Sequence, residues 1–426
     1  MVNVAKFLER VRIRYVAVAF VVIGAILAAT LGGQRNDAAA EWDAVWVTAQ
    51  QRPVAASTAV WAMSGFANQT VRQVVRVGGG GEKIRVRLSN RYGDVPLEVT
   101  GATIARSAGG AAVHPDTVRP LMIGLRPGFQ IAPGGEAATD PVLLPVAPQE
   151  SLTVTLYLAR PTGPATHHAQ ALATSYRADG DHRADPAADA FTELSRSWYY
   201  LAGIDAAAGT PRPDAVVAFG DSITDGYAST VDTNGRYPDR LAESLAAQGL
   251  SRPVLNAGIS GNRVTVDSAL LGDGAVSRFR RDVLAQPGVG TVLVLAGIND
   301  IGMSDSADPI AAPRTTVTAD RLIDGYRELI RQSRAAGVRI VGATLLPFDG
   351  SPYYTAEREQ TRQTVNAWIR TSGAYDAVID FDAVMSDPGN PRMLNPAYDS
   401  GDHLHPGDAG YRAMAAAIAA GVLTGR

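Results

Sequence analysis

Apolar residues follow two different patterns along the chain, and the pattern changes near residue 210. From 41 to 208 they alternate with polar residues, most clearly at 83–89 and 151–158, which predicts strands with one buried face. Weaker strand patterns cover 71–77 and 97–104, and turn-forming residues fall at 78–81, 91–94 and 132–135. Short alternating strands at this spacing predict an antiparallel β-sandwich or jelly roll.

After residue 214, near-continuous apolar runs take turns with amphipathic segments. The runs predict buried strands at 215–219, 254–257, 291–296, 339–345 and 377–381. The segments between and after them predict helices at 238–248, 276–285, 318–336, 356–369 and 406–420. Pro238 and Pro406 suit the first helical position, and Gly337 suits a helix stop. This alternation predicts a three-layer α/β/α sandwich around a parallel five-stranded sheet.

The first 40 residues carry a targeting pattern. Four basic residues precede an uncharged run of 19 residues at 15–33, which as a helix would reach about 28 Å, and an alanine triplet follows at 38–40. This order is typical of a signal peptide, and an uncleaved membrane anchor is the alternative. Both place the rest of the chain outside the cytoplasm. We therefore divide the chain into a leader or anchor (1–40), a β domain (41–208), a proline-containing linker (209–213) and an α/β domain (214–426).

Composition narrows the class of protein. With 19% charged and 46% hydrophobic residues the chain is globular, and a net charge of -3 without a long basic run argues against a nucleic-acid partner. The chain has no cysteine, which excludes disulfides, thiolate metal sites and a cysteine nucleophile.

Three features of the β domain could have a binding function, but each also has a purely structural explanation. The glycines at 78–81 precede a strand rather than a helix, so we expect a hairpin loop and no phosphate site. Trp42, Trp46 and Trp61 could line a sugar-binding face, but core packing explains them equally well. Six polar residues form a cluster that could bind a metal ion, but we favour a solvated loop; they are His167, His168, Asp179, Asp181, His182 and Asp185.

Four polar motifs interrupt the α/β domain at strand ends or before its last helix. They are Gly220-Asp221-Ser222, the stretch 256–262, Gly297-Ile298-Asn299-Asp300 and Asp402-His403-Leu404-His405. In order, content and context these motifs resemble the four blocks of the SGNH (GDSL-type) hydrolase superfamily over residues 214–420. The first block ends in Ile223 where many members have leucine.

The residue types in these motifs match the needs of ester hydrolysis by a serine. Ser222 is the expected nucleophile and His405 the general base, and Asp402 is close enough in sequence to orient the imidazole. A neutral base is required, so activity should fall below about pH 6.5, and a flat profile to about pH 4 would exclude His405. By the Asp-x-x-His spacing of the family, the base is His405, and His403 is not expected to take part in proton transfer.

The resemblance also implies an oxyanion hole. Its donors are the backbone N–H of Ser222, a backbone N–H of the second motif and the Asn299 side chain. In that motif the family pattern favours Gly261 over Gly258, with Asn262 as a supporting residue. Turn and helix-cap roles are the alternatives for each of these residues taken singly. Nothing in this chemistry calls for a metal or a cofactor.

We thus expect an extracytoplasmic serine ester hydrolase that cleaves short-chain acyl or acetyl esters through an acyl-enzyme, with esters on carbohydrates among the candidate substrates. Lipase or arylesterase activity, acyl transfer to a sugar, and a glycan-binding protein with an idle hydrolase domain are the alternatives. The sequence leaves the oligomeric state open.

Overall fold

A computed structural model describes residues 42–54, 61–207, 214–250 and 252–424. The leader or anchor expected at 1–40 and the linker expected at 209–213 therefore lie outside the described residues. Among the helices that the structure describes, none has both the length and the apolar character needed to cross a bilayer.

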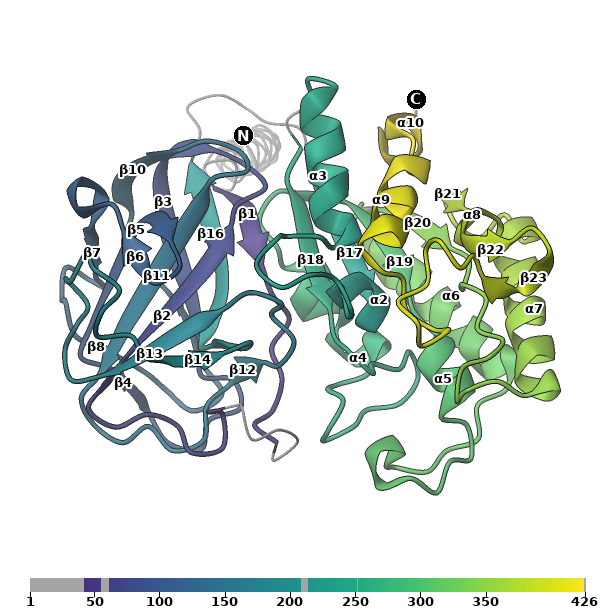
Figure 1. Cartoon of the computed structure of the whole chain (residues 1–426), viewed down its shortest axis with the longest axis horizontal. Helices are drawn as coiled ribbons and strands as arrows, with labels where there is room; N and C mark the ends of the chain where they lie inside the picture. The colour runs from purple at the N-terminus through teal and green to yellow at the C-terminus, as the bar shows by residue number, and fades with distance from the viewer. Residues whose placement is uncertain (1–41, 55–60, 208–213, 251, 425–426) are drawn as a thin grey trace, which may run out of the picture. The chain divides into compact units, whose positions relative to one another are not determined.

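The N-terminal region contains two antiparallel sheets (Figure 1). The first has the order β1 (Asp43–Val47), β16 (Leu201–Ala207), β3 (Gly81–Ser89) and β10 (Val142–Val146), with β9 (Glu136–Ala138) also on β3. The second has the order β14 (Glu193–Ser195), β13 (Ser175–Asp179), β2 (Gln69–Arg76), β11 (Ser151–Leu158), β5 (Gly101–Gly109) and β6 (Ala112–Val113), with β7 (Arg119–Leu121) on β5.

Side chains from both sheets share one core, as a sandwich requires. Ile84, Val86 and Leu88 of β3 are buried on one side of this core, as the alternation predicted. Leu152 and Leu156 of β11 face the same core from the second sheet. Period-two alternation therefore identified the inward face of β3 and β11.

Two predictions in this region are wrong. The glycines at 78–81 do not close a hairpin, because β2 and β3 belong to different sheets and the loop carries the chain between them. The strand expected at 97–104 is two strands, β4 (Leu97–Val99) and β5, because the backbone changes partner at Thr100: β4 pairs with β8 (Phe129–Ile131), whereas β5 pairs with β11.

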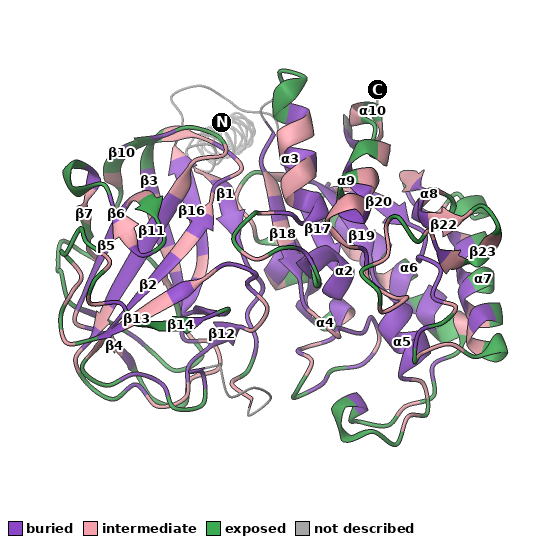
Figure 2. Cartoon of the chain, in the orientation of Figure 1, coloured by how far each residue is buried: buried purple, intermediate pink, exposed green. Residues whose placement is uncertain are grey.

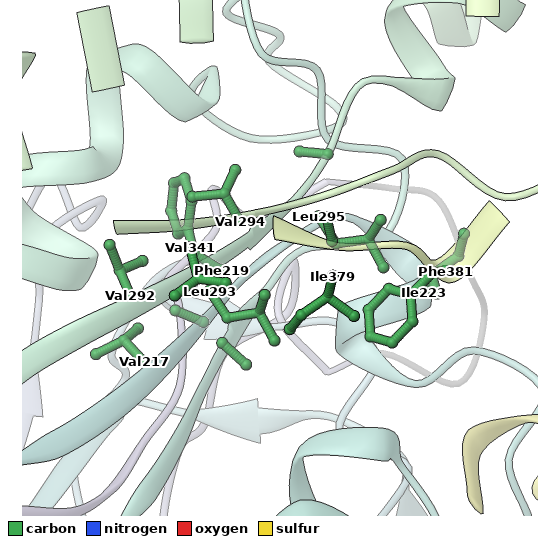
Figure 3. Close-up of a cluster of buried hydrophobic side chains, with 14 of the residues drawn as sticks. Val217, Phe219, Ile223, Val292, Leu293, Val294, Leu295, Val341, Ile379 and Phe381 are labelled. Atoms are coloured by element: carbon green, nitrogen blue, oxygen red, sulfur yellow. The ribbon is translucent and has the colours of Figure 1, made fainter. Parts of the chain in front are cut away.

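The C-terminal region is built on a parallel five-stranded sheet, as expected. Its order is β18 (Val254–Gly258), β17 (Ala215–Gly220), β19 (Val289–Leu295), β20 (Arg339–Ala343) and β21 (Ala377–Ile379). Every residue of β17, the first strand of the sheet in the sequence, is buried, and the strands form the purple centre of this region in Figure 2. Apolar side chains of the sheet, among them Val217, Phe219 and Leu293, cluster with those of the surrounding elements (Figure 3).

Helices pack in two groups that form the outer layers. The first group is α3 (Tyr237–Ala247), α8 (Phe381–Met385) and α9 (Asp408–Ala417), and the second is α4 (Ala275–Phe279), α6 (Ala319–Ala335) and α7 (Ala356–Thr371). Gly337 follows α6 with a φ of 70° and ends it, as predicted.

The ends of three elements differ from expectation. The strand at 377–381 stops at Ile379, and Phe381 instead begins α8, which Asp380 caps. The helix at 276–285 has a turn of π-helix at Arg280–Leu284. The last helix begins at Asp408 rather than Pro406, because Gly407 is its extended N-cap, and it ends at Ala417 before a short α10 (Ala420–Thr424).

Candidate active site

Ser222 lies just beyond the carboxyl end of β17, where the chain turns from this strand into the one-turn helix α2 (Ser222–Asp225). The Asp221 carboxylate caps this helix by accepting the Ile223 N–H at 3.1 Å. Burial raises the pKa of Asp221 to about 7. The strand end and the cap together hold the serine hydroxyl at the sheet edge where open α/β folds bind ligands.

His405 meets Ser222 from the loop before α9. The two side chains are joined by a 2.8 Å contact between Ser222 Oγ and His405 Nε2, although 183 positions separate them in the sequence. On the other side of the ring, His405 Nδ1 lies 2.6 Å from Asp402 Oδ2. The structure thus brings the three expected residues into one hydrogen-bonded row, in the order that a serine–histidine–aspartate relay requires.

Asp402 is held as an anion. Its Oδ1 accepts the backbone N–H groups of Leu404 at 2.9 Å and His405 at 2.8 Å. Burial alone would raise the pKa of this carboxyl, but the hydrogen bonds and the imidazole of His405 hold its pKa well below the usual range. A permanently ionised carboxylate can orient the His405 ring and stabilise its protonated form.

His403 is not part of this row. Its Nδ1 lies 2.6 Å from Asp399 Oδ2, and its side chain is 45% exposed. Gly350 packs against the His403 ring, so that even a Cβ at that position would approach the ring to 3.1 Å. His403 therefore has a carboxylate partner of its own beside the site.

Gly258 and Gly261, the two glycines of the second motif, differ in what their N–H groups do. Gly258 donates to Asn256 Oδ1 at 2.9 Å, and its α-carbon packs so closely on α2 that a Cβ would lie 2.3 Å from the Asp225 nitrogen. Gly261 has a φ of 78°, and its N–H donates to no group in the described part of the chain. Gly261 therefore remains the candidate for the expected oxyanion contact, whereas Gly258 has a packing role.

Asn299 stands at the start of α5 (Ile298–Gly302), after the third strand, and is buried. Its Nδ2 donates to the Asn262 carbonyl at 3.1 Å, and its Oδ1 accepts the Tyr353 hydroxyl at 3.2 Å. An amide nitrogen carries two hydrogens, so the second can serve another acceptor. This hydrogen has no partner among the residues that the structure describes.

Two buried ionisable side chains, Arg278 and Asp300, hold the motifs together. Arg278 of α4 donates to the Gly220 carbonyl at 2.8 Å, the Ala257 carbonyl at 2.7 Å and Asn262 Oδ1 at 2.9 Å. Asp300 accepts the backbone N–H groups of Val264 and Thr265 at 2.6 and 3.1 Å. Arg278 thus links the first two motifs, and Asp300 links the third motif to the residues that directly follow the second.

In the sequence Arg278 lies outside every motif, so no local pattern could have identified it. Asp300 was identified only as the last residue of its motif, without a role. Tyr227 was likewise missed: its ring centroid lies 4.5 Å from that of His405, and the residue is 40% exposed.

The histidines of the β-rich region correct a prediction. His167 and His168 form the strand β12 and are buried, so they do not belong to a solvated loop. His182 does fit such a loop, since it pairs with Asp185 at 2.7 Å. Within the described ranges, no three acidic or histidine side chains are grouped so that they could hold a metal ion.

Two of the three tryptophans singled out from the sequence, Trp46 and Trp61, are buried in the core and have packing roles. Trp46 is buried edge-on against Trp198 with ring centroids 4.9 Å apart, and Trp61 stacks on Tyr199 at 5.5 Å.

Comparison with known families decides the class of the C-terminal region. Residues 218–413 match the model of the GDSL-like Lipase/Acylhydrolase family. This region is a GDSL-like acylhydrolase domain. The protein is accordingly a carboxylic-ester hydrolase.

The acylhydrolase domain also has similar solved structures. A GDSL-like lipase from Bacteroides thetaiotaomicron is 22% identical, with a TM-score of 0.36, over 48% of this chain and 85% of that one. A lipolytic protein of the G-D-S-L family from Desulfitobacterium hafniense is 21% identical, with a TM-score of 0.36, over 48% and 97%. An acetylxylan esterase from Geobacillus stearothermophilus is 24% identical, with a TM-score of 0.37, over 48% and 92%. No curated protein matches the chain.

Proposed function

We propose that the protein hydrolyses its ester through a covalent acyl-enzyme on Ser222. Oγ attacks the ester carbonyl while His405 Nε2 takes the hydroxyl proton, and the same nitrogen then protonates the departing alcohol. Water, activated by the same imidazole, attacks the acyl-enzyme and releases the acid. The observation that carries this mechanism is the row from Ser222 Oγ through His405 to Asp402, with contacts of 2.8 and 2.6 Å.

The tetrahedral oxyanion would be held by three donors on three different motifs: the N–H of Ser222, the N–H of Gly261 and the Nδ2 of Asn299. Support comes from the Gly261 N–H and the second hydrogen of Asn299 Nδ2, neither of which has an acceptor among the described residues, together with the position of Ser222 at the N-terminus of α2. Such donors lower the barrier because they are already oriented before charge develops.

For the substrate we propose short-chain acyl or acetyl esters, with a sugar or aryl alcohol as the leaving group. The half-exposed ring of Tyr227 flanks His405, the group that would protonate the leaving alcohol. An aromatic surface at that point suits stacking against the face of a sugar or an aryl ring. We further propose that the enzyme works outside the cytoplasm, from the basic and apolar pattern of residues 1–40.

The mechanism is tested with a fluorophosphonate probe and the Ser222→Ala variant. Labelling of the wild type and its loss in Ser222→Ala are expected; an unlabelled wild type would favour a binding protein. A panel of p-nitrophenyl esters from acetyl to palmitoyl, together with acetylated xylan, then tests the substrate. Preference for chains of about eight carbons or more would overturn the short-acyl proposal. Product analysis with and without a sugar acceptor separates hydrolysis from acyl transfer.

A further inference from the structure

A histidine of the β-rich region reaches the first motif of the acylhydrolase domain. His168 lies on the two-residue strand β12 (His167–His168), and its ring stacks on Trp198 with centroids 5.6 Å apart. Its Nε2 lies 3.0 Å from Oδ1 of Asp225, the last residue of α2, and both side chains are almost completely buried.

Both ring nitrogens of His168 face acceptors. On the side away from Asp225, Nδ1 lies 2.9 Å from the Ala49 carbonyl oxygen. A ring with a proton on each nitrogen donates to both acceptors, and a buried hydrogen bond is costly to leave unmade. Two buried arginines lie nearby: Arg236 lies over the Trp198 ring, and Arg278 interacts electrostatically with Asp225.

Asp225, held by His168, also binds the second motif. While Oδ1 meets His168, Oδ2 accepts the Ser260 backbone N–H at 2.9 Å and the Ser260 hydroxyl at 2.7 Å. Ser260 immediately precedes Gly261, whose free N–H is the proposed oxyanion donor. Asp225 itself lies three residues after Ser222. One carboxylate therefore ties the nucleophile's helix to the oxyanion loop, and His168 fixes the orientation of that carboxylate.

We propose that His168 is a positioning residue for ester hydrolysis, acting through Asp225 and Ser260 on the Gly261 N–H. The β-rich region is then a working part of the active site rather than only an accessory domain. This inference rests on the proposed function, in which Ser222 and Gly261 act on the ester. A donor displaced by a fraction of an ångström costs rate even though it lies away from the bond that breaks.

The neighbouring His167 offers a matched control. It lies on the same strand and is just as buried, but neither of its ring nitrogens has a partner among the described residues. Burial lowers the pKa of His167 to about 4, so this ring packs in its neutral form, stacked toward Tyr199. Its replacement disturbs the same core without touching Asp225.

The test compares two variants that each keep one of the two contacts. The amide nitrogen of glutamine occupies the place of a histidine Nε2, so His168→Gln keeps a donor for Asp225. That of asparagine occupies the place of Nδ1, so His168→Asn keeps only the contact with Ala49. We measure kcat and KM on p-nitrophenyl acetate and the melting temperature for both variants, for His167→Gln and for the full-length wild type.

We expect His168→Asn to lower kcat by about tenfold or more with KM within about twofold, and His168→Gln and His167→Gln to keep kcat within about threefold. Equal losses of kcat in the two His168 variants, or an unchanged kcat in His168→Asn, would overturn the proposal. If His168→Asn does not fold, Ser260→Ala replaces it: this variant loses one of the two Asp225 contacts, and we expect a several-fold fall in kcat, whereas an unchanged kcat contradicts the inference. A wild type that neither hydrolyses the ester nor reacts with fluorophosphonate overturns the proposed function itself, a result distinct from all of these.

Discussion

The Tyr353 hydroxyl donates to Asn299 Oδ1 at 3.2 Å and helps to hold the Asn299 amide in one orientation. The Asn262 carbonyl can only accept, so it requires the amide nitrogen on its side, and the amide oxygen then faces Tyr353. Burial raises the pKa of Tyr353 to about 12, so this hydroxyl keeps its proton, and remains able to donate, near neutral pH.

Removing the Asn299 side chain should therefore cost more than removing the group that orients it. We expect Asn299→Ala to lower kcat about 10²- to 10³-fold, the usual effect of losing one oxyanion donor, with little change in KM. Tyr353→Phe retains the ring and should lower kcat by about tenfold or less. Steady-state kinetics on p-nitrophenyl acetate measures both. A larger loss in Tyr353→Phe than in Asn299→Ala would show that Tyr353 acts on the substrate directly.

The pair His405 and His403 gives a second test, because both histidines contact an aspartate at 2.6 Å on the same loop. Only His405 also meets Ser222. His405→Asn should reduce kcat by about 10³-fold or more and abolish fluorophosphonate labelling, while His403→Asn should change kcat by no more than a few fold. Comparable losses in the two variants would contradict the assignment of His405 as the base.

Local patterns predicted the elements of this protein well where burial alone decides them. Ile84, Val86 and Leu88 alternate because one face of β3 meets a core, and the strand β17 is apolar throughout because helices cover both faces of its sheet. The patterns failed where the structure depends on which strands pair. No residue between 97 and 104 indicates that the chain changes its partner strand at Thr100. The glycines at 78–81 would look the same in a hairpin and in a crossing between sheets.

The same limit applies to the site. Ser222, Asp402 and His405 could be named from sequence because their motifs carry them, and the structure brings their side chains together. Arg278 was not named, and His168 was named only as part of a metal-site or loop cluster, since their importance comes from contacts with residues 58 and 57 positions away. A histidine beside another histidine in a polar stretch looks solvated until its strand and its buried partner are known.

The two glycines of the second motif should respond differently to alanine. At Gly258 a Cβ would lie 2.3 Å from the Asp225 nitrogen and 2.7 Å from its α-carbon, and a backbone cannot move aside as a side chain can. At Gly261 the obstacle is the flexible Leu271 side chain at 2.6 Å, and the φ of 78° adds about 1–2 kcal/mol of strain.

We therefore expect Gly258→Ala to lower the free energy of unfolding by several kcal/mol, more than Gly261→Ala does. Urea denaturation followed by circular dichroism compares the two variants. Gly261→Ala should nevertheless lose the larger share of kcat per folded molecule. A Gly258→Ala variant as stable as the wild type would mean that α2 and β18 do not pack as closely as the structure has them.

Asp221 makes the stability of the protein depend on pH in an unusual direction for an aspartate. Its pKa is about 7 in the folded state, because burial disfavours the charge, against about 4 in an unfolded chain. Between these two values the folded protein binds more protons than the unfolded chain, so stability falls as pH rises from about 4 to about 7 and is constant, for this group, outside that window.

The Asp221→Asn variant tests this directly. Asparagine keeps an oxygen that can accept the Ile223 N–H but cannot ionise. The stability of the variant relative to wild type should therefore rise with pH, by at most on the order of 1 kcal/mol per pH unit between pH 4 and 7. Urea midpoints of both proteins at pH 5 and pH 8 measure this difference. Asp300, also buried with a raised pKa, is present in both proteins. Parallel pH profiles for the two proteins would show that Asp221 ionises as readily when folded as when unfolded, which would require water or a cation to reach it behind the nucleophile.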